Sequence, residues 1–218
     1  MLKKVVVFDS GFGGELFANY IEKELPVVEV IRVIDWRNLD IITKKPKETK
    51  NVTEQAIRPY IGHVDLIIFA NYLVTFMDLK YFQREYPSQK FMGFAMPQIR
   101  SERTLILTSK ALHKSRGFKK YLHSFEDVRS RTIECDSWIP LIDDAELTED
   151  QVRRDLLRLK GFLPQTIALA YTNLIDIKPM LFKIFGPIVN ITDGYRDTLH
   201  NVCQELGLRG LDGRRAKR

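Results

Sequence analysis

Short apolar runs rich in β-branched residues recur along the chain and alternate with stretches of helical character. The runs are continuous rather than alternately apolar and polar, which is typical of central parallel strands covered on both faces. Repeated alternation of this kind predicts an α/β fold with mainly parallel sheets flanked by helices. The strand candidates are residues 3–8, 28–34, 66–69, 90–93, 104–108, 132–135, 166–169 and 188–192.

Two of the intervening segments have apolar side chains at helical spacing. Residues 15–24 and residues 150–160 each place such side chains along one face of a predicted helix. Thr148 and Gln151 have the spacing of a capping box at the start of the second helix. The charged segment 43–50 contains Pro46, and we interpret it as a loop, either a solvated connection or, as the less common alternative, a mobile lid.

Length and composition describe an ordinary globular chain. With 218 residues, 44% of them hydrophobic, it can bury one substantial core or two smaller lobes. No apolar run approaches the roughly 20 residues of a membrane-spanning helix, and we expect neither a signal peptide nor a membrane partner. The two cysteines, Cys135 and Cys203, make no disulfide framework or zinc motif. These features indicate a cytoplasmic protein with no bound metal.

The formal net charge is +6, from 34 basic and 28 acidic side chains. Part of the excess lies in residues 209–218, which we interpret as a solvated tail. An arm that binds nucleic acid is the alternative, although no aromatic residue lies between those charges to stack on bases. A nucleic-acid partner therefore stays open.

Polar residues directly follow three of the strand candidates. Ligands of parallel α/β folds bind at the carboxyl ends of strands, so these positions are the candidate site. They supply carboxylate, hydroxyl and amide groups, and the glycine-rich turn at 11–14 adds backbone N–H donors, a set that suits a small anion. The positions are Asp9 and Ser10, then Ala70 and Asn71, and then Tyr171, Thr172 and Asn173.

The glycines of residues 7–14 (VFDSGFGG) do not make a nucleotide motif. Leu16 stands where a dinucleotide fingerprint has its third glycine, and the Gly-Lys-Ser/Thr of a P-loop is missing. The segment instead resembles the opening F-D-S-G-x-G-G of the glutamate and aspartate/glutamate racemase family. Further segments resemble that family in the same order, namely residues 68–71, 93–97, 135–143, 170–173 with 178–181, and 191–194.

The resemblance covers nearly the whole chain and implies a fold. It implies two similar α/β lobes with a ligand cleft between them. The first lobe would comprise residues 1–96 plus 189–218, and the second residues 97–188. It also implies an isomerase-type site that uses no cofactor.

Two departures from the family concern its chemistry. The family removes an α-proton on one face of an amino acid and returns one on the other, using one cysteine from each lobe. Here Ala70 stands at the first cysteine position and Tyr171 at the second, or Ala170 if the alignment slips by one residue. Alanine carries no proton, and a tyrosine with its usual pKa of about 10 is mostly neutral at pH 7. The P-Y-G segment that follows the family's second strand is also missing.

We therefore expect a diverged racemase-family protein, impaired or inactive in two-base racemisation, that binds a small acidic or anionic ligand. Asp9 and Tyr171 are the candidate catalytic residues, although simple packing also accounts for Tyr171. The candidate ligand contacts are Ser10, Asn71, Thr172 and Asn173. Two alternatives stay open: an active isomerase or lyase with a single non-cysteine base, and a regulatory protein that binds protein or nucleic acid. Assembly as a homodimer is also open.

Overall fold

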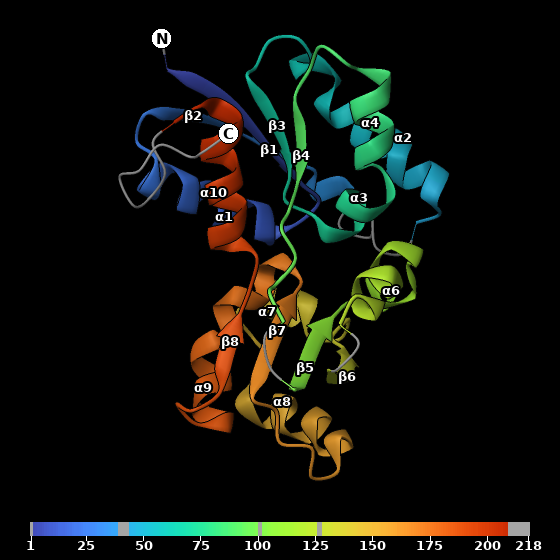
Figure 1. Ribbon diagram of the computed structural model, residues 1–218, viewed down its shortest axis with the longest axis vertical. Coiled ribbons are helices and arrows are strands. Elements are labelled where there is room, and N and C mark those ends of the chain that lie inside the picture. The colour runs from blue at the N-terminus through green and yellow to red at the C-terminus, as the bar shows by residue number, and fades with distance from the viewer. Residues whose placement is uncertain (1, 39–43, 100–101, 126–127, 209–218) are drawn as a thin grey trace. The chain divides into compact units, whose positions relative to one another are not determined.

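The computed structural model describes residues 2–38, 44–99, 102–125 and 128–208. The chain divides into two compact units, Met1–Ala95 with Gly194–Arg218, and Met96–Asp193. Each unit contains a four-stranded parallel sheet with helices packed against it (Figure 1). The prediction of an α/β fold with parallel sheets flanked by helices is therefore confirmed. The basic residues 209–218 lie outside the described residues.

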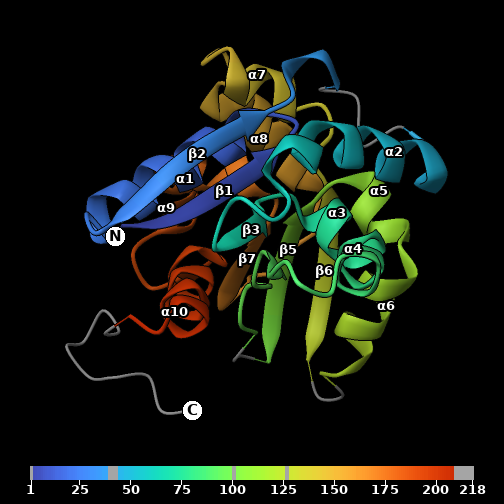
Figure 2. The same cartoon turned by 90° about the horizontal axis from the view of Figure 1, so that it is seen from above.

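The sheet of the first unit has the strand order β2-β1-β3-β4, and β2, β1 and β3 follow one another in Figure 2. The strands are β1 (Lys3–Asp9), β2 (Val28–Ile34), β3 (Leu66–Phe69) and β4 (Phe91–Gly93). The helices are α1 (Phe12–Glu24), α2 (Pro46–Ile57), α3 (Tyr72–Met77), α4 (Leu79–Glu85) and α10 (Tyr195–Leu206), with a 3-10 helix at Arg58–Tyr60. Figure 1 shows α1 and α10 on one side of this sheet and α2, α3 and α4 on the other. Both faces of β1 and β3 are thus covered, which is why their apolar runs are continuous.

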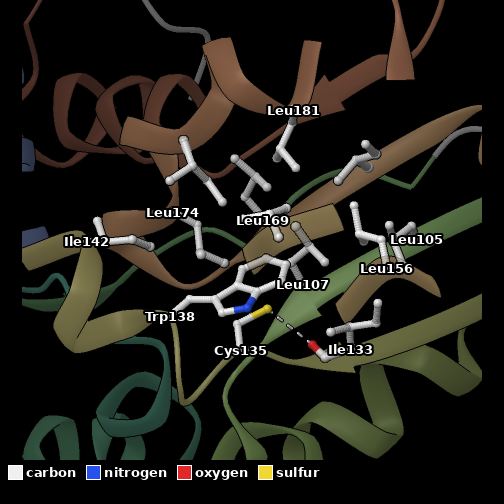
Figure 3. Packing of buried hydrophobic residues seen from close by; sticks show 13 residues of the cluster. Leu105, Leu107, Ile133, Cys135, Trp138, Ile142, Leu156, Leu169, Leu174 and Leu181 are labelled. Atoms are coloured by element: carbon white, nitrogen blue, oxygen red, sulfur yellow. Dashed lines mark hydrogen bonds between the residues drawn. The ribbon is translucent and has the colours of Figure 1, made fainter. Parts of the chain in front are cut away.

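The second unit repeats this plan with the strand order β6-β5-β7-β8. Its strands are β5 (Arg103–Thr108), β6 (Arg129–Glu134), β7 (Thr166–Ala170) and β8 (Asn190–Thr192). Its helices are α5 (Lys110–Lys114), α6 (Arg116–His123), α7 (Ile139–Asp143), α8 (Glu149–Leu156) and α9 (Lys178–Phe185), with 3-10 helices at Leu157–Leu159 and Thr172–Ile177. Trp138 is fully buried in the core of this unit, among leucines that include Leu107, Leu169 and Leu174 (Figure 3).

The predicted capping box at the start of α8 is confirmed. The backbone N–H of Gln151 donates to Thr148 Oγ1 over 3.4 Å, and the backbone N–H of Thr148 donates to Gln151 Oε1 over 2.7 Å. Each side chain therefore satisfies a backbone N–H that has no partner within the helix.

The interpretation of residues 43–50 as a loop is wrong. Residue 43 lies outside the described residues, but α2 begins at Pro46 and extends to Ile57. Proline suits the first position of a helix because its fixed φ matches the helix and its missing N–H has no partner to lose. The apolar side chains that attach α2 to the sheet, Val52 and Ile57, come after the charged turn, so the segment 43–50 alone gave no sign of them.

The junction of α3 and α4 contains a buried carboxylate. Asp78 is 5% exposed, and its Oδ2 has no hydrogen-bond partner among the described residues. Burial raises the pKa of Asp78 to about 6, and the positive charge of Lys50 on α2 opposes that rise. The Lys50 ammonium itself lies 4.2 Å from the ring centroid of Tyr81. The Asp78 carboxylate is therefore ionised at neutral pH in a site that disfavours its charge.

We predict that Asp78 makes the protein less stable as the pH rises. Its pKa is higher in the folded than in the unfolded chain, so its contribution is most favourable below about pH 4 and is lost as the pH rises through about 6. Asp78→Asn should raise the free energy of unfolding at pH 7.5 by about 2 kcal/mol and have little effect at pH 4. Denaturant unfolding at both pH values measures this. The exposed Asp144→Asn is the control, and an equal change in both variants would contradict the prediction.

Candidate functional site

The carboxyl ends of the two central strands of the first sheet carry a buried polar cluster. Asp9 ends β1, and Asn71 comes two residues after the end of the neighbouring strand β3. The Asn71 amide donates from Nδ2 to Asp9 Oδ1 over 2.9 Å, and the backbone N–H of Ser10 donates to the same oxygen over 2.7 Å. The structure thus brings together the three candidate residues predicted for this edge, and all three are buried. Their roles in binding or catalysis stay predictions.

Asn71 uses both ends of its side chain. While Nδ2 contacts Asp9, Oδ1 accepts a hydrogen bond from the backbone N–H of Val74 over 3.1 Å and caps the start of α3. This is the usual role of asparagine before a helix, and it fixes the orientation of the amide. Ala70, directly before it, is fully buried, and its backbone N–H donates to the carbonyl of Phe8.

Gly14 allows α1 to start close to this cluster. A Cβ atom at Gly14 would lie 2.5 Å from the Cβ of Asp9 and 2.7 Å from Cδ1 of Ile34. Neither approach is possible for a real side chain, so a larger residue would push α1 away from the ends of β1 and β2. The glycine in the motif is therefore needed for close packing of the helix beside Asp9.

The corresponding edge of the second unit has a different polar pair. Tyr171 follows β7 and packs against the hydrophobic core of this unit, while Thr172 and Asn173 are buried in the 3-10 helix Thr172–Ile177. The Asn173 amide donates from Nδ2 to Oδ1 of Asp143, the last residue of α7, over 2.8 Å. Its own Oδ1 is buried and has no hydrogen-bond partner among the described residues.

Asp143 is the residue that the sequence did not single out. Burial raises its pKa, the hydrogen bond from Asn173 opposes this, and the nearby Asp144 and Asp176 raise it further. The available signal was its place at the end of the segment 135–143, where the racemase pattern C-P-x-F-V-P-L-V-E has its glutamate. The expected convergence of Asp9 and Asn71 with Tyr171 stays a prediction.

Neither cysteine has the surroundings of a proton carrier. Cys135 and Cys203 are both fully buried. The Cys135 thiol donates to the carbonyl of Ile133 over 3.5 Å inside the core around Trp138 (Figure 3). Burial raises the pKa of both thiols. Both sulfurs are therefore neutral thiols at physiological pH, whereas a thiolate is the form that accepts a proton.

The described ranges contain neither a metal-binding cluster nor a membrane-spanning helix. No group of three or more His, Cys, Asp or Glu side chains there could hold a metal ion. In the same residues, no helix is long and apolar enough to cross a membrane.

Curated proteins similar to this chain are glutamate racemases, whereas no protein-family model matches it. The glutamate racemase of Exiguobacterium sibiricum is 24% identical over 97% of this chain and 82% of its own length. That of Microcystis aeruginosa is 23% identical over 96% of this chain and 78% of its own length.

Solved structures show the same similarity in three dimensions. Escherichia coli glutamate racemase, in complex with L-glutamate and the activator UDP-MurNAc-Ala, matches with a TM-score of 0.86 at 14% identity, over 100% of this chain and 85% of that chain. Picrophilus torridus aspartate racemase matches with a TM-score of 0.66 at 14% identity, over 94% of each chain. The chain therefore has the Asp/Glu racemase fold.

We predict that Asn71→Ala destabilises the first unit. The change removes the cap of α3 and leaves the buried Asp9 carboxylate without one of its donors. Each loss is typically worth about 1 kcal/mol or more, so the free energy of unfolding should fall by about 2–3 kcal/mol. Denaturant unfolding measures this. Asn51→Ala, at an exposed position of α2, should change stability by less than about 0.5 kcal/mol, and equal effects of the two variants would refute the structural role of Asn71.

Proposed function

We propose that this chain is a diverged relative of the glutamate racemases that binds a small acidic amino acid or a similar anion and does not racemise it with thiols. The Asp/Glu racemase fold and the curated relatives support the relationship. The ligand class rests on the names of those relatives and on the Escherichia coli and Francisella tularensis glutamate racemase structures, which contain L-glutamate and D-glutamate.

The main observation behind the proposal is that the chain's only two thiols are buried. Two-base racemisation needs one ionisable group on each face of a weakly acidic α-carbon, with a pKa near the working pH. Cys135 and Cys203 are closed off in hydrophobic cores, and burial raises the pKa of both. The positions that resemble the family's two cysteines hold Ala70 and Tyr171. The thiol nearest to a strand end, Cys135 directly after β6, is sealed in the core around Trp138.

The polar groups at these edges support retention of a ligand. The Asn71 amide has two N–H bonds at Nδ2, and the contact with Asp9 uses one of them. Ser10 adds a hydroxyl beside it, and Thr172 adds another at the edge of the second sheet. Because the orientation of Asn71 is fixed by its cap on α3, little conformational entropy is lost when it contacts a carboxylate.

A one-base enzyme is the second candidate, and Asp143 favours it. This carboxyl group lies at the carboxyl edge of the second sheet, held by Asn173, and burial raises its pKa towards the range in which it can both give and take a proton. Asp9 and Tyr171 were the single bases expected from the sequence, and Asp143 is a third with surroundings that shift its pKa.

Exchange of the α-proton tests both candidates. In deuterated water, we predict that glutamate and aspartate of either hand acquire α-deuterium no faster with the protein than in buffer, as measured by proton NMR. Isothermal titration calorimetry with the same amino acids should nevertheless give saturable heat. Absence of heat with all four would overturn the ligand-binding proposal. Enzyme-like exchange that disappears in Asp143→Asn would establish the second candidate instead.

Restoring thiols provides a gain-of-function test. The double variant Ala70→Cys with Tyr171→Cys should gain α-proton exchange, because it returns a thiol to each position that resembles a family cysteine. The matched control carries serine at both positions, since serine has a similar size but a far higher pKa. Equal exchange by the serine and cysteine variants would count against thiols as the missing element.

A further inference from the structure

A hollow of about 710 Å³ lies on the first unit, between the end of β2, the turn that follows it and the C-terminal half of α2. Its volume is in the range of small-molecule sites, about 300–1,000 Å³. Val33, Val52 and Ala56 supply apolar walls. Neither Asp9, Ser10 nor Asn71 lines it, so the hollow is distinct from the polar cluster at the strand ends.

The hollow is lined by two aromatic rings. Trp36 is 47% exposed there, while the chain's other tryptophan, Trp138, is buried to 1% exposure. Tyr60, at the end of the 3-10 helix, lines the same hollow. A half-exposed indole beside a phenol offers flat apolar surface on which a planar ring can stack.

A largely unoccupied guanidinium group stands beside these rings. The Arg37 side chain is 94% exposed, and its only ion-pair contact among the described residues is with Asp35, at 3.9 Å. Asp35 is itself held by Asn38, whose Nδ2 donates to its Oδ2 over 2.7 Å. Among the described residues, most N–H donors of Arg37 are thus available to an anion, in the planar arrangement that suits phosphate and carboxylate.

The other arginine of the hollow is already occupied. Arg32 donates to Glu22 over 2.6 and 2.7 Å, to Glu15 over 3.0 Å and to Asn19 over 2.8 Å. These contacts occupy four of the five N–H donors of Arg32 and neutralise its charge with two glutamates, so Arg37 is the arginine of the hollow better placed to recognise an anion. Gln55, exposed on α2, adds a neutral amide to the rim.

From these contacts we infer that the hollow binds a flat aromatic ring that carries an anionic group, such as a ring bearing phosphate or carboxylate. The ring stacks on Trp36 and Tyr60, and the anion pairs with Arg37. The inference stands apart from the proposed amino-acid ligand, since it uses different residues.

Adenosine monophosphate (AMP) is a suitable probe because it combines a planar ring with a phosphate. Its binding should quench the fluorescence of Trp36 saturably, and calorimetry should give the same dissociation constant. Adenosine, which lacks the anion, and inorganic phosphate, which lacks the ring, should each bind at least about tenfold more weakly. A lack of saturable AMP binding, or equal binding of adenosine and AMP, would overturn the inference.

Two variants test which residue contacts the phosphate of AMP and which contacts its ring. Arg37→Gln should weaken AMP binding about tenfold and leave adenosine binding unchanged, because only the anion contact is lost. Trp36→Leu should weaken both ligands by calorimetry. Arg58→Gln, at an exposed arginine of the same unit that does not line the hollow, is the control. Equal weakening by Arg37→Gln and Arg58→Gln would show general attraction of anions to a basic protein and refute the site. Thermal unfolding of each variant verifies that the fold is intact.

Discussion

The hydrogen bond from Asn71 to Asp9 ties together the ends of the two central strands of the first sheet. Its acceptor lies at the end of β1, and its donor also caps α3. A buried carboxylate is tolerated there because backbone and side-chain donors converge on it. The close approach of α1 to Asp9 also depends on Gly14, because a side chain at that position would clash with Asp9. The Asn71–Asp9 hydrogen bond thus lies where the two central strands end, where α3 begins and where α1 packs. The candidate ligand-binding groups lie at the same point.

The second unit also has an amide–carboxylate hydrogen bond at the carboxyl ends of its strands, but between different elements. Again an amide that follows a central strand donates to a carboxylate, but Asn173 meets Asp143 from α7 rather than the end of a neighbouring strand. Burial and the nearby Asp144 and Asp176 raise the pKa of Asp143, while the hydrogen bond from Asn173 lowers it. Amide–carboxylate pairs therefore occur at the carboxyl ends of both sheets.

Much of this architecture follows from local sequence, and its exceptions have physical causes. The strand at 66–69 was predicted to the residue, because a strand buried on both faces reads as a continuous apolar run. The strand at 28–34 was also predicted to the residue, from its β-branched residues, although it is a half-buried edge strand that contains Glu29 and Arg32. The strand β6 begins at Arg129 rather than at 132, since it lies at a sheet edge, where charged residues pair through their backbone and stay in water. Asp143 was missed because its partner is 30 residues away, a contact that no local pattern reveals.

The likeness in fold to the racemases and the reactivity of the thiols depend on different atoms. Fold depends on apolar strands, on Gly14 and on the caps, and all of these are compatible with identities of 14–24%. Thiol chemistry depends on a sulfur that can ionise, and burial in a core opposes ionisation because a low dielectric disfavours the thiolate. Cys135 shows the distinction within one segment. It lies in the stretch that resembles the family, yet it packs beside Trp138 as a small apolar side chain. Likeness in fold and reactivity of the thiol are therefore separate properties of this segment, since burial raises the pKa of the Cys135 thiol.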